Sequence, residues 1–494
     1  MLSASLLAKN CYSEPSVYEL LVYNKNRFSV SVHRQIFTVL VFALPIFSSA
    51  QLFAGELKIR KVADSIIDSN ALHFAEGTWG KCVNGQTFQQ DALTSFNGWQ
   101  YATYYDAERK LCVARRKLNA PNWEVIRFAD YLFKGNDTHN VAVIGICPRD
   151  GTIHLSFDHH GDPLHYRVSR PDAALHPEKY KWTAELFGAI TSELEPDKKL
   201  TRVTYPRFLR TPDGALQFGC RIGGSGNGEK CLADYDYATA TWTNFGAFAG
   251  RAGVYENSSE RNPYLNGLTY DRKGRLHVTW CWRETGDPMS NHDLDYAWSD
   301  DRGKTWFSNV GKKIGERGKT PVTIDSPGVR VVEIGMKRGL ANATTQAVDS
   351  RNRIHVATFH LPDDVPQQAD WESTRKKAHY FHYWRDDKGE WQRNEMNFIG
   401  SRPQLWFDQS DNAYLIFIGD RFNPSPNLSI AAASAKSRWT DWKIIHREAG
   451  PFSGQPQLDH YGQPGILSIY IQEEPKIPDG TSSPLRVLDF KPKN

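Results

Sequence analysis

The chain has 494 residues, of which 40% are hydrophobic and 12% aromatic, with glycine and proline distributed along its length. This composition is typical of a globular, strand-rich protein and excludes a coiled coil or a low-complexity, disordered chain. The formal net charge of +4 comes without a basic run or tail, so nothing indicates a nucleic-acid-binding surface.

An export signal is predicted near the N-terminus. A histidine and an arginine precede an apolar run from Ile36 to Phe47, and the small residues of positions 48–50 follow as a cleavage site. The run is about a dozen residues, too short to cross a bilayer. We therefore expect residues 1–50 to be a signal peptide with an over-extended gene start, and residues 51–494 to form one secreted domain. A buried helix is the alternative for the apolar run.

Strands are predicted along nearly all of the remaining chain, because short alternating apolar runs are separated by Asp, Asn and Gly turns. One pattern of strand, polar turn and strand recurs, with neighbouring turns 43 to 78 residues apart. The seven turns lie near Glu108, Gly151, Gly214, Gly274, Asn352, Asn412 and Gly462. Seven units at this spacing predict an all-β fold, a seven-bladed β-propeller, since two packed sheets would not need the pattern seven times.

One motif marks this architecture more specifically. Residues 299–306 read Ser-Asp-Asp-Arg-Gly-Lys-Thr-Trp, which fits the S-x-D-x-G-x-T-W Asp box of sialidase-like propellers. A degenerate copy at residues 385–391 keeps the aspartate, the glycine and the tryptophan. The Ser and Asp side chains of such a box stabilise a tight turn while the Trp packs beneath it, so the motif indicates a fold rather than a reaction.

Two consecutive hairpins carry the candidate chemistry. In the first, the strand after His139 turns near Gly151 and returns to His159 and His160. Strict antiparallel pairing places His139 opposite His160, and a one-residue bulge places it opposite His159. The sequence leaves these two alternatives open.

The second hairpin turns at Asp213, and Tyr205 and Arg221 each lie eight residues from it. We therefore expect Tyr205 to face Arg221. The glycine-rich run 223–228 follows and allows close approach of a ligand to the backbone. Because the hairpins belong to successive blades, their ends should meet on one rim of the central channel.

Histidines, a tyrosine and an arginine suit β-elimination at a uronic acid better than hydrolysis, since no matched pair of carboxylates is evident. An arginine can neutralise the uronate and so acidify its C5 proton. A tyrosine whose pKa is lowered by a guanidinium, or a histidine, can take that proton and protonate the leaving oxygen. Strand histidines and Tyr–Arg stacking pairs are also common structural features, but the four together favour a functional site.

From about Phe74 to Trp391 the chain resembles the seven-bladed propeller ulvan lyases, within the BNR-repeat polysaccharide lyases. The matching stretches are DTHNVAVIG (137–145), FDHHGDPLHYRVS (157–169), the run 203–228 with its Tyr and Arg sixteen residues apart, the run 261–284 and the Asp box. The resemblance implies a secreted lyase that cleaves ulvan, a sulfated rhamnose–uronic acid polysaccharide, and leaves 4,5-unsaturated uronyl ends.

The resemblance also implies roles for individual residues. Tyr205 is expected to be the general base, and also the acid, with His139 as the partner proton carrier. Arg221 is expected to bind the uronate carboxylate, and either His159 or His160 to assist. Substrate binding is expected of Asn140, Arg207, Asn262, Tyr264, Arg283 and Glu284.

A structural metal ion, zinc or calcium, is a further implication of the resemblance, although the chemistry requires no cofactor. The candidate ligands match no standard zinc signature, so dispersed core residues are the alternative. These candidates are Cys281, His292, His360, His379 and His382.

The expected partner is an acidic sulfated polysaccharide, bound by a monomer without a membrane span. Two other functions remain as alternatives. A sialidase-like hydrolase would need an arginine triad and a carboxylate that the sequence does not assemble. A non-catalytic propeller would bind acidic glycans without releasing fragments.

Overall fold

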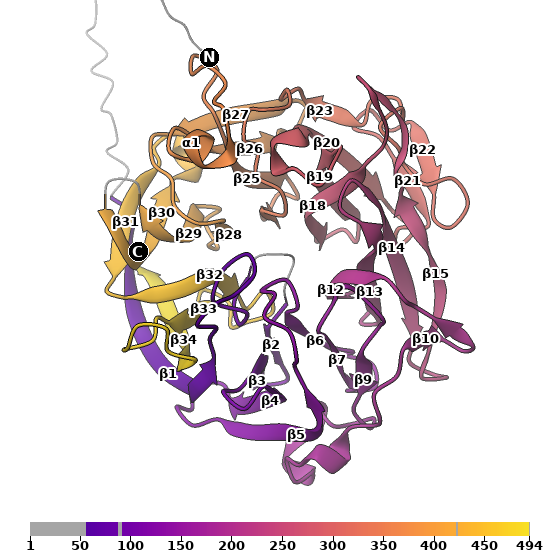
Figure 1. The fold of residues 1–494 in the computed structure, drawn as a ribbon, viewed down its shortest axis with the longest axis vertical. Coiled ribbons are helices and arrows are strands. Elements are labelled where there is room, and N and C mark those ends of the chain that lie inside the picture. Colours follow the sequence, from indigo (N-terminus) through magenta and orange to yellow (C-terminus); the bar gives the residue numbers. More distant parts are fainter. Residues whose placement is uncertain (1–55, 87–90, 421–422, 494) are drawn as a thin grey trace, which may run out of the picture. The chain divides into compact units, whose positions relative to one another are not determined.

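Seven β-sheets surround a central axis in the computed structural model (Figure 1), which describes residues 56–86, 91–420 and 423–493. The described residues lie within the unit Ala54–Asn494. The predicted signal peptide lies outside the described residues. Within them, no helix is long and apolar enough to cross a membrane.

The first four sheets follow one another along the chain, except that β8 of the third sheet precedes β9 of the second. The first contains β2 (Leu93–Phe96), β3 (Trp99–Tyr105), β4 (Lys110–Lys117) and β5 (Glu124–Leu132). The second contains β6 (Ala142–Ile146), β7 (Ile153–Phe157) and β9 (Tyr166–Val168). The third contains β8 (His160–Asp162), β12 (Val203–Arg210), β13 (Leu216–Gly224), β14 (Asn227–Asp236) and β15 (Thr241–Ala249). The fourth contains β18 (Asn262–Tyr270), β19 (Leu276–Arg283), β20 (Asn291–Ser299), β21 (Thr305–Phe307), β22 (Lys313–Glu316) and β23 (Arg330–Val332).

The last three sheets complete the ring. The fifth contains β24 (Thr345–Val348), β25 (Ile354–His360), β26 (His379–Arg385) and β27 (Trp391–Met396). The sixth contains β28 (Gln404–Phe407), β29 (Ala413–Asp420), β30 (Asn423–Ala433) and β31 (Lys443–Glu448). The seventh contains β32 (Phe452–Leu458), β33 (Leu467–Glu473), β34 (Ser482–Lys493) and β1 (Lys58–Leu72).

A few short elements lie outside the seven sheets. Two small hairpins consist of β10 (Glu193–Glu195) with β11 (Lys198–Lys199) and of β16 (Ala252–Tyr255) with β17 (Ser258–Glu260). The helical elements are α1 (Trp371–Arg375) and the 3₁₀ turns Pro177–Lys179, Ala184–Leu186, Pro288–Ser290 and Ala435–Ser437.

The ring is closed without a covalent bond by pairing the two ends of the described chain. Strand β1 runs antiparallel to β34, from Lys58 opposite Lys493 to Leu72 opposite Ser482. In Figure 1 the indigo β1 lies beside the yellow β34. The N-terminal part of the described chain thus supplies the outermost strand of the seventh sheet, whose other three strands are C-terminal.

Seven hydrophobic clusters hold neighbouring sheets together, one in each interface between adjacent blades. For example, one cluster joins Val143 of β6 to Phe208 of β12, and another joins Leu232 of β14 to Trp280 of β19. Each sheet therefore buries both faces, which explains why its strands are apolar almost throughout.

The structure confirms the predicted seven-bladed β-propeller, and it corrects one of the seven turns. Six predicted turns join the innermost strand of a sheet to the second strand, whereas the turn at Glu108 joins the second strand, β3, to the third, β4. The corresponding turn of that sheet is Asn97-Gly98, with φ of 48° and 78°. Two left-handed residues are what a two-residue hairpin turn of type I′ requires.

The Asp box has the structural role predicted for it. Ser299 Oγ accepts a hydrogen bond from Gly303 N at 2.8 Å, and Asp301 Oδ1 accepts from Thr305 N at 2.8 Å. Trp306 is fully buried, and its Nε1 donates to Gly303 O at 3.0 Å. The motif thus closes the turn between β20 and β21.

Candidate active site

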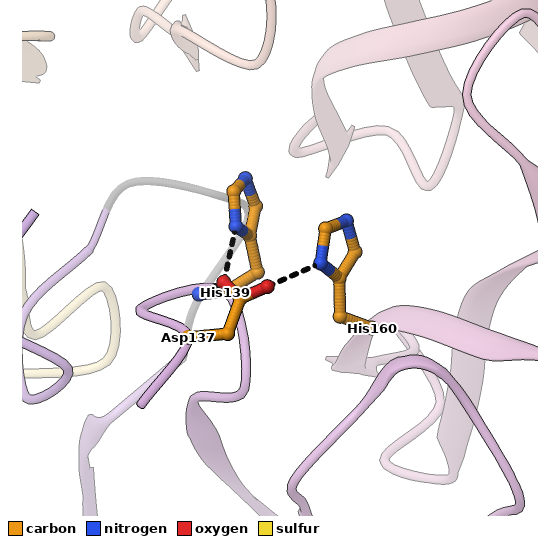
Figure 2. A group of neighbouring side chains, drawn as sticks. All are labelled: Asp137, His139 and His160. Carbon is orange, nitrogen blue, oxygen red and sulfur yellow. Dashed lines mark hydrogen bonds and ion pairs between the residues drawn. The ribbon is translucent and has the colours of Figure 1, made fainter. Parts of the chain in front are cut away.

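A carboxylate flanked by two histidines lies where the second and third blades meet (Figure 2). Asp137 and His139 precede β6, and His160 begins β8. Asp137 Oδ1 lies 2.7 Å from His139 Nδ1, and Asp137 Oδ2 lies 2.7 Å from His160 Nδ1. The two imidazole rings stack with centroids 4.2 Å apart and planes 16° apart. One carboxylate therefore orients both rings.

This arrangement determines where the protons of the two rings lie. In a neutral imidazole, the nitrogen that faces a carboxylate carries the hydrogen, and the other nitrogen carries the lone pair. Burial lowers the pKa of His139 to about 4, against the opposing hydrogen bond to Asp137. Burial would raise the pKa of Asp137, but hydrogen bonds from His139 and His160 outweigh it and hold that pKa below its usual value. Near neutral pH the structure therefore pairs an ionised Asp137 with a neutral His139 whose Nε2 is basic.

The structure distinguishes the two histidines that the sequence left open. The β6–β7 register pairs Ala142 with Phe157, and its continuation places His139 opposite His160. His159 is instead fully buried, where its Nε2 accepts a hydrogen bond from His165 N at 2.7 Å and burial holds its pKa well below the usual value. It is thus His160 that lies in the cluster, while His159 stacks on His165.

Tyr205 occupies a β-bulge. In the β12–β13 register Thr204 pairs with Arg221 and Arg207 pairs with Gly219, so that Tyr205 and Pro206 together oppose one residue. The prediction that Tyr205 itself faces Arg221 is therefore wrong by one residue. Tyr205 has a left-handed backbone, with φ of 53°, a conformation that is strained for an aromatic residue.

The bulge nevertheless brings the predicted partners together. The Arg221 guanidinium carbon lies 4.9 Å from the centroid of the Tyr205 ring, and the ring of His139 lies 6.1 Å from it. The innermost strands β6 and β12 begin on the same rim of the propeller, which is why residues at their first positions converge. Tyr205 thus links the histidine pair to a cationic region.

Tyr264, at the start of β18, is the second tyrosine of this region. Its hydroxyl oxygen accepts from Arg221 Nη1 at 3.2 Å and from Arg283 Nη1 at 3.4 Å, and it lies 2.9 Å from Ser225 Oγ. The rings of Tyr205 and Tyr264 lie 5.9 Å apart. Ser225 belongs to the glycine-rich run 223–228, so this run lies beside Tyr264.

The two tyrosines differ in their tendency to ionise. Burial would raise the pKa of Tyr264, but the charges of Arg221 and Arg283 outweigh it and lower that pKa. Burial and the adjacent Tyr264 raise the pKa of Tyr205 above its usual value, despite Arg221. The lowering that the sequence predicted for Tyr205 therefore falls on its neighbour, and Tyr205 remains a proton donor.

The predicted substrate-binding residues fall into two groups. Asn262 and Arg283 pair across β18 and β19, next to Tyr264, so these three lie at the site. The side chains of the other three interact with neighbouring residues of the fold. Asn140 donates a hydrogen bond to Asp158 Oδ1, and Glu284 accepts hydrogen bonds from Arg261 and His292. Arg207 lines the axial channel, with its Nε 3.6 Å from Asp91 Oδ2.

Three residues of the site were missed by the sequence interpretation. Asp137 stands two positions before His139, and that proximity was its only signal. Lys230 is the cross-strand partner of Arg221 and is fully buried, with Nζ 5.0 Å from the Tyr205 ring; burial holds its pKa well below the usual value. Arg402 belongs to no sequence motif that could have pointed to it. Burial lowers its pKa to about 10, and its charge acts on Tyr205.

The five predicted metal ligands lie in separate environments. His292 contacts Glu284 and Asp293, His360 contacts Tyr383, and His379 contacts Glu395, while His382 contacts His355 and Cys281 contacts a backbone carbonyl. Within the described ranges, the one group of three or more His, Cys, Asp or Glu side chains close enough to share an ion is Asp137, His139 and His160. The five residues therefore do not fit a common metal ion.

Comparisons with known proteins agree with the fold. Residues 99–399 match the family described as BNR repeat-containing family member. The chain is 17% identical to the polysaccharide lyase Uly1, with a TM-score of 0.68 over 87% of this chain and 99% of that one. It is 12% identical to a PL25 ulvan lyase bound to -[GlcA(1-4)Rha3S]-, with a TM-score of 0.62 over 87% and 95%.

Relatives of known activity are similar over part of the chain. The long isoform of ulvan lyase from Glaciecola sp. (strain KUL10) is 28% identical over 255 residues, which are 42% of this chain and 25% of the relative. The long isoform from Pseudoalteromonas sp. (strain PLSV) is 28% identical over 292 residues, 50% of this chain and 28% of the relative. The chain thus matches about a quarter of the length of these relatives.

Proposed function

The chain belongs to the BNR repeat-containing family, and from this membership and the geometry of the site we propose that it is a polysaccharide lyase that cleaves ulvan by β-elimination at the uronate. The observation that carries the proposal is the position of Tyr205, between two histidines oriented by one carboxylate and a tyrosine held by two arginines. The names of the similar proteins support the choice of ulvan among acidic glycans.

Binding of the uronate would use the cationic side of this site. Arg221 and Arg283 both point their guanidinium groups at the Tyr264 hydroxyl, and they provide the positive charge that a C6 carboxylate requires. Neutralising that carboxylate stabilises the carbanion-like charge that develops when the C5 proton leaves. The deeply buried Arg402, whose charge acts on Tyr205, adds to the same positive field.

Proton transfer would use the histidine side together with Tyr205. We assign the removal of the C5 proton to neutral His139, through Nε2, because its lowered pKa keeps it unprotonated. The electron pair of the C5–H bond forms the C4=C5 double bond as the C4–O bond breaks. The raised pKa of Tyr205 keeps its hydroxyl protonated, so that it donates its proton to the leaving oxygen. This assignment reverses the roles that the sequence suggested for Tyr205 and His139.

The product provides a direct test. We expect incubation of the protein with ulvan to raise ultraviolet absorbance as 4,5-unsaturated uronyl ends accumulate. Release of new reducing ends without that absorbance would indicate a hydrolase instead, and binding of the polysaccharide without fragments would indicate a glycan-binding module. Either result would contradict the proposal. Heat-inactivated protein is the control for spontaneous elimination.

The acid limb of the pH profile tests the role of His139. A base must be unprotonated to act, so kcat/KM should fall as the pH drops through the pKa of His139, about 4, and should be flat above it until the acid Tyr205 or the protein itself titrates. The measurement is kcat/KM on ulvan across the acid range. An acid limb near the ordinary histidine pKa of about 6.5 would contradict a base with the lowered pKa of His139.

We also propose that the enzyme acts outside the cell as a monomer. The apolar run and small-residue cleavage site near the N-terminus support export, and a polymeric substrate requires it.

A further inference from the structure

Trp79 is exposed next to the candidate active site. Of the fifteen tryptophans in the chain, all of which lie in the described residues, Trp79 is the one with an exposed side chain, at 72%. Its ring meets the ring of His139 nearly at a right angle, with planes 84° apart and centroids 6.1 Å apart. The ring of His139 therefore contacts both the ring of His160, which stacks on it, and the ring of Trp79.

The backbone holds Trp79 in this position. Thr78 forms a parallel bridge to Asp137, and its N donates to Asn136 O at 2.9 Å. The buried Thr138 hydroxyl lies 3.3 Å from both Thr78 O and Trp79 O. The segment that presents Trp79 is thus attached to the same short segment that carries Asp137 and His139.

The conformation at Trp79 is unfavourable for its residue type. Trp79 has φ of 65°, in the left-handed region, where glycine or asparagine would be less strained. The loop is also tight, because a Cβ on Gly77 would lie 2.0 Å from Gly80 O. A large indole that is both strained and exposed contributes little to the core, and its contact with His139 places it where a bound ligand would meet it.

We propose that Trp79 is a sugar-stacking platform that binds a pyranose ring flanking the cleaved uronate, an inference that rests on the proposed lyase function. The C–H face of a pyranose packs well on an indole, which supplies a large, rigid apolar surface at low entropic cost. The ring of Trp79 adjoins His139, so a sugar stacked on it lies next to the residue that faces the C5 proton. The charged uronate then sits toward Arg221 and Arg283, and a neighbouring sugar with an apolar face sits on Trp79.

Kinetics of Trp79 variants on ulvan test this platform. We expect Trp79→Ala to raise KM about tenfold with kcat nearly unchanged, and Trp79→Phe to restore most of the affinity. Trp79→Gly should raise KM equally while leaving the melting temperature the same or higher, because glycine relieves the left-handed strain. Val310→Ala, at a side chain that is 79% exposed in another loop, is the matched control and should change neither constant.

A binding measurement separates this inference from the proposed activity. In the Tyr205→Phe background, migration through gels that contain ulvan should be retarded, and Trp79→Ala should release that retardation. If the wild-type protein produces no unsaturated ends, the lyase proposal fails, and the gels still decide whether Trp79 binds the glycan. A fall in kcat at constant KM, or equal migration of the two proteins, would overturn the platform.

Discussion

Replacing Tyr205 by phenylalanine is expected to reduce kcat on ulvan by about 10³-fold while the protein stays folded. The substitution removes only the hydroxyl, which in our proposal donates the proton to the leaving oxygen. Without it an alkoxide must leave unprotonated. The ring is kept, so its packing against Tyr264 and the guanidinium of Arg221 is retained. Initial rates of ultraviolet product formation and a melting curve are the two measurements.

Tyr237→Phe is a matched control, because this tyrosine is 42% exposed and belongs to the β14–β15 turn rather than to the site. It should leave the rate unchanged. Tyr264→Phe should have an intermediate effect, since it disturbs the arginines without removing the proton donor. A Tyr205→Phe variant with nearly wild-type rate would show that the leaving oxygen is protonated by another group.

Replacing Asp137 by asparagine should lower kcat by a similar amount, about 10³-fold, without touching a group that contacts substrate. The asparagine amide can donate a hydrogen bond to Nδ1 of His139 where the carboxylate only accepts. Such a bond places the imidazole hydrogen on Nε2 and abolishes the basic nitrogen that faces the site. Asp137 is therefore a positioning residue, and its effect passes through both histidines.

The pH profile distinguishes positioning from simple loss of structure. The charge of Asp137 raises the pKa of His139, so the residual activity of Asp137→Asn should show its acid limb at a lower pH than the wild type. Asp479→Asn, at an aspartate that is 70% exposed and paired with Lys81, is the control and should change neither rate nor profile. A wild-type rate in Asp137→Asn would mean that the histidine pair does not depend on this carboxylate.

Much of the architecture could be predicted because propeller blades are local. Each hairpin is specified by a turn signal and by the alternation of its own two strands, so the turns at Gly151, Gly214 and Gly274 were correctly placed. The first blade shows the limit of this reasoning. Both Asn97-Gly98 and the turn at Glu108 are good turn signals, and only the position of β2 beside the axis shows which one corresponds to the others.

The candidate site was predictable only where it is made of one hairpin. Strand register predicts that His139 lies opposite His160. The same rule predicts that Tyr205 lies near Arg221, but the bulge makes Thr204, one residue earlier, the strand partner of Arg221. Pro206 cannot donate to the ladder, but this alone does not specify a bulge. The strained backbone of Tyr205 is maintained by packing against the neighbouring blade.

The sequence by itself determined the class of fold, the number of blades, and a set of histidines, a tyrosine and an arginine at the ends of two hairpins, because these depend on residues close together along the chain. Only the tertiary structure decided which histidine joins His139, that Asp137 orients both rings, and which tyrosine is the more acidic. Those properties arise where separate sheets meet, because burial and the charges of Arg221 and Arg283 act across space rather than along the chain.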